Sequence, residues 1–279
     1  MRRISKEQII MFRVFLMEEE KARATIEKYT RDVTDFTEWL SDKEVTKTEV
    51  VNYKLLLSEK YAPASVNCAI SSLNHFFSFL EWNDLKMKAL KIQRRIFVPE
   101  EKELTKEEYQ KLLCAAKQKK NERLYLLMQT ICSTGIRVSE LQYITVEAVR
   151  YGRTEIQSKG KCRSVLLSKD LCKMLKAYAS ERKISSGPLF VTKNGKPLDR
   201  SNVWSDMKKL CASAGVSEKK VFPHNLRHLF ARTYYSIQKD IVRLADILGH
   251  SNVNTTRIYT VESGTIHRQQ LQRLGLLRC

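Results

Sequence analysis

The sequence lacks the features that mark membrane and secreted proteins. No stretch of its 279 residues approaches the roughly 18 consecutive apolar residues of a transmembrane helix. The amino-terminal Met-Arg-Arg-Ile-Ser-Lys-Glu runs into a charged amphipathic segment and has no apolar signal core. These absences predict a cytoplasmic protein that does not associate with a membrane.

Cysteine pairs with metal-binding or redox spacing are also missing. The seven cysteines are scattered, odd in number and never in C-x-x-C spacing. This argues against a disulfide framework or a zinc module and predicts free thiols in a reducing compartment. Cys162, beside Lys161, could be a reactive thiol, although a place in a hairpin explains it equally well.

The signatures of nucleotide-dependent and metal-dependent enzymes are absent as well. There is no G-x-x-x-x-G-K-[ST] motif and no carboxylate cluster suited to Mg²⁺. A zinc protease would need glutamate between His224 and His228, but position 225 is Asn225. The sequence thus predicts no cofactor and no metal. It favours a structural, hydrogen-bonded His228 over a two-histidine metal site.

Acidic residues are in the minority, and the basic excess is uneven. The 50 Lys and Arg against 31 Asp and Glu give a net charge of +19. Residues 1–98 carry +3 of this charge and residues 99–279 carry +16. The balance favours a polyanionic partner bound mainly by the second part of the chain. A basic protein without such a partner and a membrane-surface protein are weaker alternatives.

The first part of the chain shows helical periodicity without strand-like alternation. Val66, Ile70, Leu73 and Phe77 share one face of a helix that begins near Pro63. The aromatic run at 75–79 is expected to pack in the core and not to stack on bases. Other helices are expected over 6–19, 22–41 and 46–58.

A boundary is expected where a charged stretch with Pro99 has no sustained period. Thr105 and Glu108 then form a capping box that starts a new helix. The predicted division is a helical domain at 1–93, a linker at 94–103 and a second domain at 104–279.

The second domain is predicted to be mainly helical with a small insert of strands. Arg153–Gln157 and Arg163–Leu167 read as two short strands around a hairpin tip with Gly160. Leu189–Val191, followed by Asn194-Gly195, predicts another strand and turn. Helices or helical turns are expected over 168–183, 200–213, 225–238, 240–248 and 252–258.

An arginine follows a glycine turn in this domain. Thr134-Gly135-Ile136 leads into Arg137 at the start of an expected helix, and Glu140 lies three residues further on the same face. The pair is either an exposed ion pair of little worth or a carboxylate that orients a phosphate-binding guanidinium. The sequence leaves both interpretations open.

The last third of the chain carries further groups suited to a phosphate diester. His224 and Arg227 share one helix face, His250 follows a glycine C-cap, and Tyr259 comes nine residues later. Arginines neutralise phosphate oxygens, histidines move protons or donate hydrogen bonds, and a tyrosine hydroxyl can be a nucleophile. Taken alone, Tyr259 is more simply a packing residue.

In this order the motifs resemble those of the tyrosine recombinases, the family of phage and transposon integrases and of chromosome-dimer resolution recombinases. The resemblance covers essentially the whole chain. It implies a mainly α fold, with an N-terminal helical core-binding (SAM-like) domain and a C-terminal mixed α/β catalytic domain that holds a small antiparallel sheet. The motifs are T-G-I-R-x-S-E-L at 134–141, K-G at 159–160, H-x-L-R-H at 224–228 and L-G-H…T-T-x-I-Y-T at 248–260.

The resemblance implies a role for each site residue. Tyr259 would attack the scissile phosphate and form a 3′-phosphotyrosyl link, while Arg137 and Arg227 bind the non-bridging oxygens. His224 and His250 would hydrogen-bond the phosphate, and His224 could accept the tyrosine proton. Lys159 would protonate the leaving 5′-oxygen. Lys161 is the alternative because the loop is about one residue shorter than is common, and Glu140 would support the site without reacting.

It also implies the partners. Double-stranded DNA at a specific recombination site would be held by four protomers in a synaptic tetramer and exchanged through a Holliday junction, without ATP, with an accessory protein as a further partner. The tail at 266–277 would dock on a neighbouring protomer or pack within its own subunit. Chromosome-dimer resolution and mobile-element integration both fit. A type IB topoisomerase-like enzyme and a catalytically silent DNA-binding protein are the alternative functions.

Overall fold

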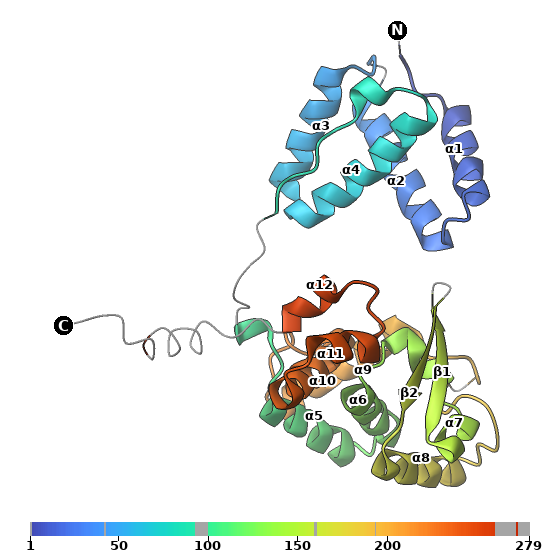
Figure 1. Cartoon of the computed structure of the whole chain (residues 1–279), viewed down its shortest axis with the longest axis vertical. Coiled ribbons are helices and arrows are strands. Elements are labelled where there is room, and N and C mark those ends of the chain that lie inside the picture. Colours follow the sequence, from blue (N-terminus) through green and yellow to red (C-terminus); the bar gives the residue numbers. More distant parts are fainter. Residues whose placement is uncertain are drawn as a thin grey trace. The chain divides into compact units, whose positions relative to one another are not determined.

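The computed structural model describes residues 2–41, 43–92, 100–158, 161–192, 194–259 and 272. The chain divides into two compact units, Met1–Arg94 and Arg95–Cys279, and each has a hydrophobic core of its own. Figure 1 shows the elements of each unit. None of the helices in these ranges is long and apolar enough to span a membrane.

The first unit is a bundle of four helices in which α4 packs against α2 and α3. Ser5 and Gln8 form a capping box at the start of α1, and Pro63 occupies the first turn of α4. The prediction that the aromatic run packs in the core is confirmed, since Phe76 and Phe77 are both fully buried. The helices are α1 (Lys6–Glu18), α2 (Arg23–Leu40), α3 (Lys47–Lys60) and α4 (Pro63–Phe79), followed by the 3-10 turn η1 (Asn83–Leu85).

The second unit is helical around one antiparallel hairpin, which confirms the predicted mainly α class with a small sheet. Strands β1 (Arg153–Ser158) and β2 (Lys161–Leu166) pair with Arg153 opposite Leu166. The longer helices are α5 (Lys106–Gln118), α6 (Glu122–Thr134), α8 (Lys169–Glu181), α9 (Arg200–Ala214) and α10 (Pro223–Gln238). The shorter ones are η2 (Glu100–Lys102), η3 (Val138–Tyr143), α7 (Val146–Tyr151), α11 (Ile241–Leu248), α12 (Val253–Thr256) and η4 (Arg257–Tyr259).

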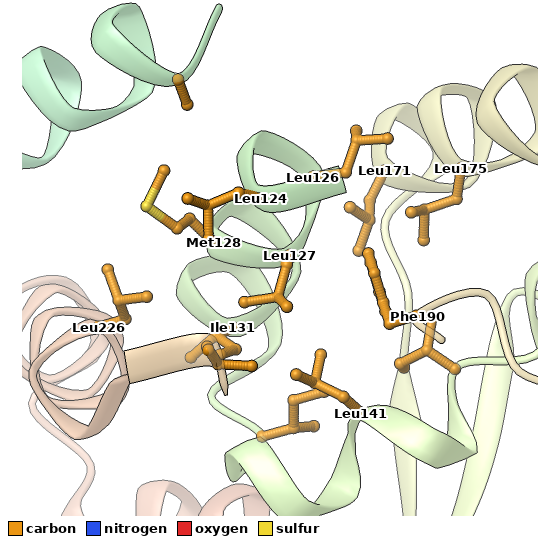
Figure 2. Packing of buried hydrophobic residues seen from close by; sticks show 14 of the residues in the cluster. Leu124, Leu126, Leu127, Met128, Ile131, Leu141, Leu171, Leu175, Phe190 and Leu226 are labelled. Carbon is orange, nitrogen blue, oxygen red and sulfur yellow. The ribbon is translucent and has the colours of Figure 1, made fainter. Parts of the chain in front are cut away.

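Helix α6 forms the centre of this unit and packs against α5, α8, α9 and α10. Figure 2 shows Leu127 and Ile131 of α6 facing Leu141, Phe190 and Leu226 from other segments. A helix that is apolar on nearly all sides must be surrounded by partners. Because Gly135 ends α6, the packing of this central helix fixes where the segment with Arg137 begins.

Several predicted elements differ from the structure. Leu189–Val191 is no strand, because Val191 makes only an isolated bridge to Pro197. The helix expected after Arg137 is the 3-10 helix η3. Within the predicted 94–103 linker, Glu100–Lys102 is also a 3-10 turn. Residues 93–99, the hairpin tip at 159–160 and all of the 266–277 tail except position 272 lie outside the described residues.

Candidate active site

Arg227 is the buried centre of the site. It lies one turn into α10, and only 1% of it is exposed. Its Nη1 donates to the Gly135 carbonyl at 2.5 Å and its Nη2 to the Leu248 carbonyl at 2.7 Å. These bonds join α10 to the ends of α6 and α11. Burial and the positive charge of Arg137 lower the pKa of Arg227 to about 10, so the guanidinium stays charged near neutral pH.

Gly135 is required by the close approach of these helices. It has a φ of +67°, and a Cβ added there would lie 2.4 Å from Cδ1 of Phe230 and 3.1 Å from Cδ2 of Leu248. Only glycine combines this backbone conformation with this lack of space. The glycine thereby lets the chain turn from α6 to Arg137 directly beside α10.

His250 is held in one orientation from both sides of its ring. Its Nε2 lies 3.1 Å from Nη2 of Arg227, and its Nδ1 lies 2.8 Å from Oγ1 of Thr256. A guanidinium can only donate, so Nε2 accepts and Nδ1 carries the proton that it donates to Thr256. Burial, followed by the charges of Arg227 and Arg137, lowers the pKa of His250 to about 4. The ring is therefore neutral near pH 7.

Glu140 is shared by two arginines. Its carboxylate accepts from Nη1 of Arg137 at 2.9 Å and from both Nη atoms of Arg163 at 3.1 and 2.8 Å. The Arg137 backbone N–H adds a fourth bond at 2.7 Å. Burial raises the pKa of Glu140, but the bonds from Arg163 and Arg137 outweigh it, and the pKa lies below its usual range. At 3% exposure this carboxylate is not part of an ordinary surface ion pair.

Tyr259 ends η4 and is 4% exposed. Its ring is perpendicular to that of His228 at a centroid distance of 4.9 Å and nearly parallel to that of His250 at 6.2 Å. Burial raises the pKa of Tyr259, whereas the charge of Arg227, a hydrogen bond with it, and the charge of Arg137 oppose this rise. The tyrosine hydroxyl thus lies in the field of both arginines.

Two further histidines of α10 meet edge to face, and the second, His228, is the one that contacts this tyrosine. The rings of His224 and His228 are 4.4 Å apart. Burial together with neighbouring positive charge lowers the pKa of His224, and burial together with the positive charge around it lowers that of His228 to about 3. Among the residues that the structure describes, no three His, Cys, Asp or Glu side chains gather as a metal site.

The lysines expected at the hairpin tip cannot be compared with these residues. Lys159 lies outside the described residues, and only the backbone of Lys161 is described, as the first residue of β2. The neighbouring Cys162 donates to Oε2 of Glu155 at 3.2 Å, and this carboxylate raises the pKa of the thiol. A raised pKa makes a thiol less reactive, which weakens the interpretation of Cys162 as a reactive residue.

The structure thus brings Arg137, Glu140, His224, Arg227, His250 and Tyr259 together, and it adds two residues that the sequence did not single out. Arg163 is the stronger partner of Glu140, and Thr256 accepts the Nδ1–H of His250 and so holds its ring in place. The position of Arg163 six residues before the start of α8 gave no signal. Thr256 lay within a recognised motif, so its burial beside His250 was the missing information.

Comparison with known families agrees with this arrangement. Residues 102–264 match the Phage integrase family, and residues 9–84 match the "Phage integrase, N-terminal SAM-like domain". The first match spans more than half of the chain and all the described site residues. The chain belongs to the phage integrase family of tyrosine recombinases, an enzyme class that cleaves and transfers DNA strands without ATP.

Relatives cover nearly the full length. The chain is 30% identical to tyrosine recombinase XerA of Pyrococcus furiosus over 277 residues, which are 95% of this chain and 93% of the relative. In fold it is similar to XerH bound to its difH substrate in a pre-cleavage complex, with a TM-score of 0.70, 22% identity and coverage of 93% and 82%. It is also similar to lambda integrase in a tetramer bound to a Holliday junction, with a TM-score of 0.71, 19% identity and coverage of 91% and 76%.

Proposed function

We propose that this chain recombines DNA at a specific site and that Tyr259 is its covalent nucleophile. The observation that carries the proposal is the convergence of Tyr259, Arg227 and His250, with Arg137 close enough for its positive charge to act on all three. A tyrosine surrounded by fixed positive charge is suited to attack an anionic phosphate.

In the proposed first step, Oη of Tyr259 attacks the scissile phosphorus. The bond to the 5′-oxygen breaks, and a 3′-phosphotyrosyl link forms. The tyrosine proton passes to His224; burial and neighbouring positive charge lower the pKa of this histidine, so its ring is neutral near pH 7 and has a nitrogen lone pair for the proton. Lys159, with Lys161 as the alternative, supplies the proton to the leaving 5′-oxygen.

Arg137 and Arg227 bind the non-bridging oxygens of the scissile phosphate, where negative charge grows as phosphorus becomes five-coordinate. The Nε2 atom of His250 faces Arg227 as an acceptor in the free protein. A bound phosphate dianion in the transition state would favour protonation of this ring, which then donates to the phosphate. Because Tyr259 is 4% exposed, its hydroxyl must become accessible when DNA binds.

The assembly that we propose is four protomers on two copies of the DNA site, with a Holliday junction as the intermediate. The similarity in fold to the lambda integrase tetramer on such a junction supports it. The basic excess of the second part of the chain fits a duplex partner. We place this activity in the cytoplasm, where the DNA lies, and an accessory protein is a further partner that the family resemblance suggests.

The nucleophile is tested with a nicked suicide duplex. Its sequence is first selected from randomised duplexes by binding to the Tyr259→Phe protein, which retains the DNA-binding surface. The unaltered protein should form a covalent adduct that survives denaturant, because the short nicked fragment diffuses away. Tyr259→Phe should form none, since it lacks the attacking oxygen.

Tyr235→Phe is the matched control because Tyr235 packs against the same apolar cluster as Tyr259. It should form the adduct at an unchanged rate. An adduct in the Tyr259→Phe protein would show that another residue is the nucleophile. No adduct with the unaltered protein on its selected site would favour the silent DNA-binding alternative.

The general acid is tested with a sulfur atom in place of the 5′-bridging oxygen. A thiolate leaves without a proton, so this substrate bypasses the acid. Lys159→Ala should slow cleavage of the ordinary duplex by about 10²- to 10⁴-fold. The same variant should cleave the sulfur duplex at nearly the rate of the unaltered protein. Lys161→Ala is compared in parallel, and rescue of this variant alone would transfer the role to Lys161.

A further inference from the structure

We propose that Arg163 is a positioning residue for cleavage. It holds the Glu140 carboxylate in place, so that Arg137 keeps free N–H groups for the scissile phosphate. The inference rests on the proposed function and adds a residue that lies in none of the four family motifs. Arg163 comes from β2, whereas Glu140 comes from η3, so the contact is a long-range one.

The two arginines differ in how they use the shared carboxylate. Both Nη atoms of Arg163 are committed to Glu140, at 3.1 and 2.8 Å, and its side chain is 13% exposed. Arg137 gives only Nη1, at 2.9 Å, and its side chain is 37% exposed. No further bond joins the Arg137 guanidinium to another described residue. Arg163 is therefore the arginine bound to the protein, and Arg137 is the one open to a ligand.

Glu140 has no capacity left for other partners. Two ionised oxygens offer about four acceptor positions, and the structure fills all four. Without Arg163, a single arginine would have to neutralise a buried carboxylate. Arg137 would then be drawn more completely onto Glu140 and would bind phosphate less well. The paired, bidentate form of Arg163 is one that lysine cannot reproduce.

A second contact of Arg163 reaches the turn before His250. A Cβ added to Gly249 would lie 2.6 Å from Nη1 and 2.8 Å from Cδ of Arg163. The guanidinium thus lies directly against the Gly249 backbone, which has a φ of +66° and leads to His250. One side chain therefore braces the carboxylate of the Arg137 pair and the turn that carries His250.

The test uses single-turnover cleavage of the nicked suicide duplex by the full chain at saturating protein. Arg163→Met keeps the length of the side chain but removes the charge and the fork. Cleavage should fall by about 10- to 100-fold, because a small misplacement of a group that binds the reacting phosphate can cost up to about 100-fold in rate. Arg163→Lys should recover only part of the rate. DNA affinity should change less than about threefold, because both Nη atoms of Arg163 are already bonded to Glu140.

Arg153→Met is the matched control, since Arg153 is an exposed arginine on the partner strand of the same hairpin. A double-mutant cycle with Glu140→Gln then asks whether Arg163 acts through Glu140. In the Glu140→Gln background, Arg163→Met should slow cleavage little further, because the carboxylate that Arg163 positions has already been removed. Two losses that multiply would overturn the inference.

The pH profile adds a readout that a merely structural role would not move. The charged groups facing Glu140 are Arg137 and Arg163, and Arg227 of α10 also lies within reach of its charge. Without Arg163 the pKa of Glu140 rises, so the acid limb of the cleavage rate should move to higher pH in Arg163→Met. Arg153→Met should leave it unmoved.

The outcomes separate this inference from the proposed function. If the unaltered protein forms no adduct, the proposed function fails and the role of Arg163 fails with it. If the adduct forms and Arg163→Met cleaves as fast as Arg153→Met, only the inference fails. A loss that appears chiefly as weaker DNA binding would make Arg163 a DNA contact and would also overturn it.

Discussion

The chemistry at the residue scale depends on which groups carry protons. Arg227 can only donate, and this fixes Nε2 of His250 as an acceptor and Nδ1 as the protonated nitrogen. Burial, together with nearby positive charge, lowers the pKa of His224 and of His228 and keeps both rings neutral. The free protein therefore keeps the His224 ring neutral, while burial raises the pKa of Tyr259. The positive field is built in before DNA arrives.

These histidines predict a loss of stability in acid. The pKa lies at about 3 for His228 and about 4 for His250 in the folded protein, against 6.5 in the unfolded chain. Between pH 6.5 and pH 4 the unfolded state binds more protons, so the free energy of unfolding should fall as pH drops through this window. Urea unfolding at several pH values measures it.

His228→Gln serves as the comparison, because glutamine keeps a polar side chain of similar length without a titrating group. The variant should show a shallower loss of stability between pH 6.5 and pH 4 than the unaltered protein. An equal slope in both proteins would mean that His228 becomes protonated without unfolding.

At the scale of elements, the site depends on how closely α6, α10 and α11 approach. Gly135→Ala should destabilise the protein by about 2–5 kcal/mol, from a left-handed conformation and from overpacking against Phe230. Gly152→Ala is the matched control, since Gly152 has a φ of +70° and nothing within 4 Å of an added Cβ. It should cost only about 1–2 kcal/mol. Equal losses in urea unfolding would contradict the close approach.

Local patterns in the sequence predicted most elements because those elements are stabilised locally. The capping box at Thr105 and the proline at the start of α10 mark helix ends through contacts within a few residues. The predictions of secondary structure were wrong where tertiary packing, and not the local sequence, decides the backbone conformation. Val191 pairs only with Pro197, and the segment after Arg137 winds as a 3-10 helix while Glu140 turns inward.

The site was predictable only in part for the same reason. Motifs carry residues that the chemistry requires at fixed spacing, so Arg137, Arg227 and Tyr259 could be recognised from the sequence. Arg163 lies 23 residues from Glu140, and nothing local to either residue predicts that the hairpin folds back on η3. Partners chosen by packing become visible only in three dimensions.

At the scale of the whole molecule, each unit has its own core, and the charge is divided unequally between them. Of the net charge of +19, residues 1–94 carry +2 and residues 95–279 carry +17. Neutralised phosphates release counterions, so the second unit should contribute most of the salt-dependent affinity for a duplex. Because the first unit is nearly neutral, we expect it to contribute to DNA binding through shape and groove contacts more than through charge.

The function of the whole molecule requires two DNA sites, and this separates a recombinase from a topoisomerase-like enzyme. The phosphotyrosyl link stores the energy of the broken phosphodiester, so a 5′-hydroxyl from either duplex can religate without ATP. A supercoiled plasmid with two selected sites in direct repeat should therefore yield two circles, and the linearised plasmid should yield one circle and one shorter linear fragment, all visible by gel electrophoresis. A plasmid with one site should lose supercoils far more slowly than the two-site plasmid recombines. Rapid relaxation at a single site without recombinant circles would instead identify a topoisomerase-like activity.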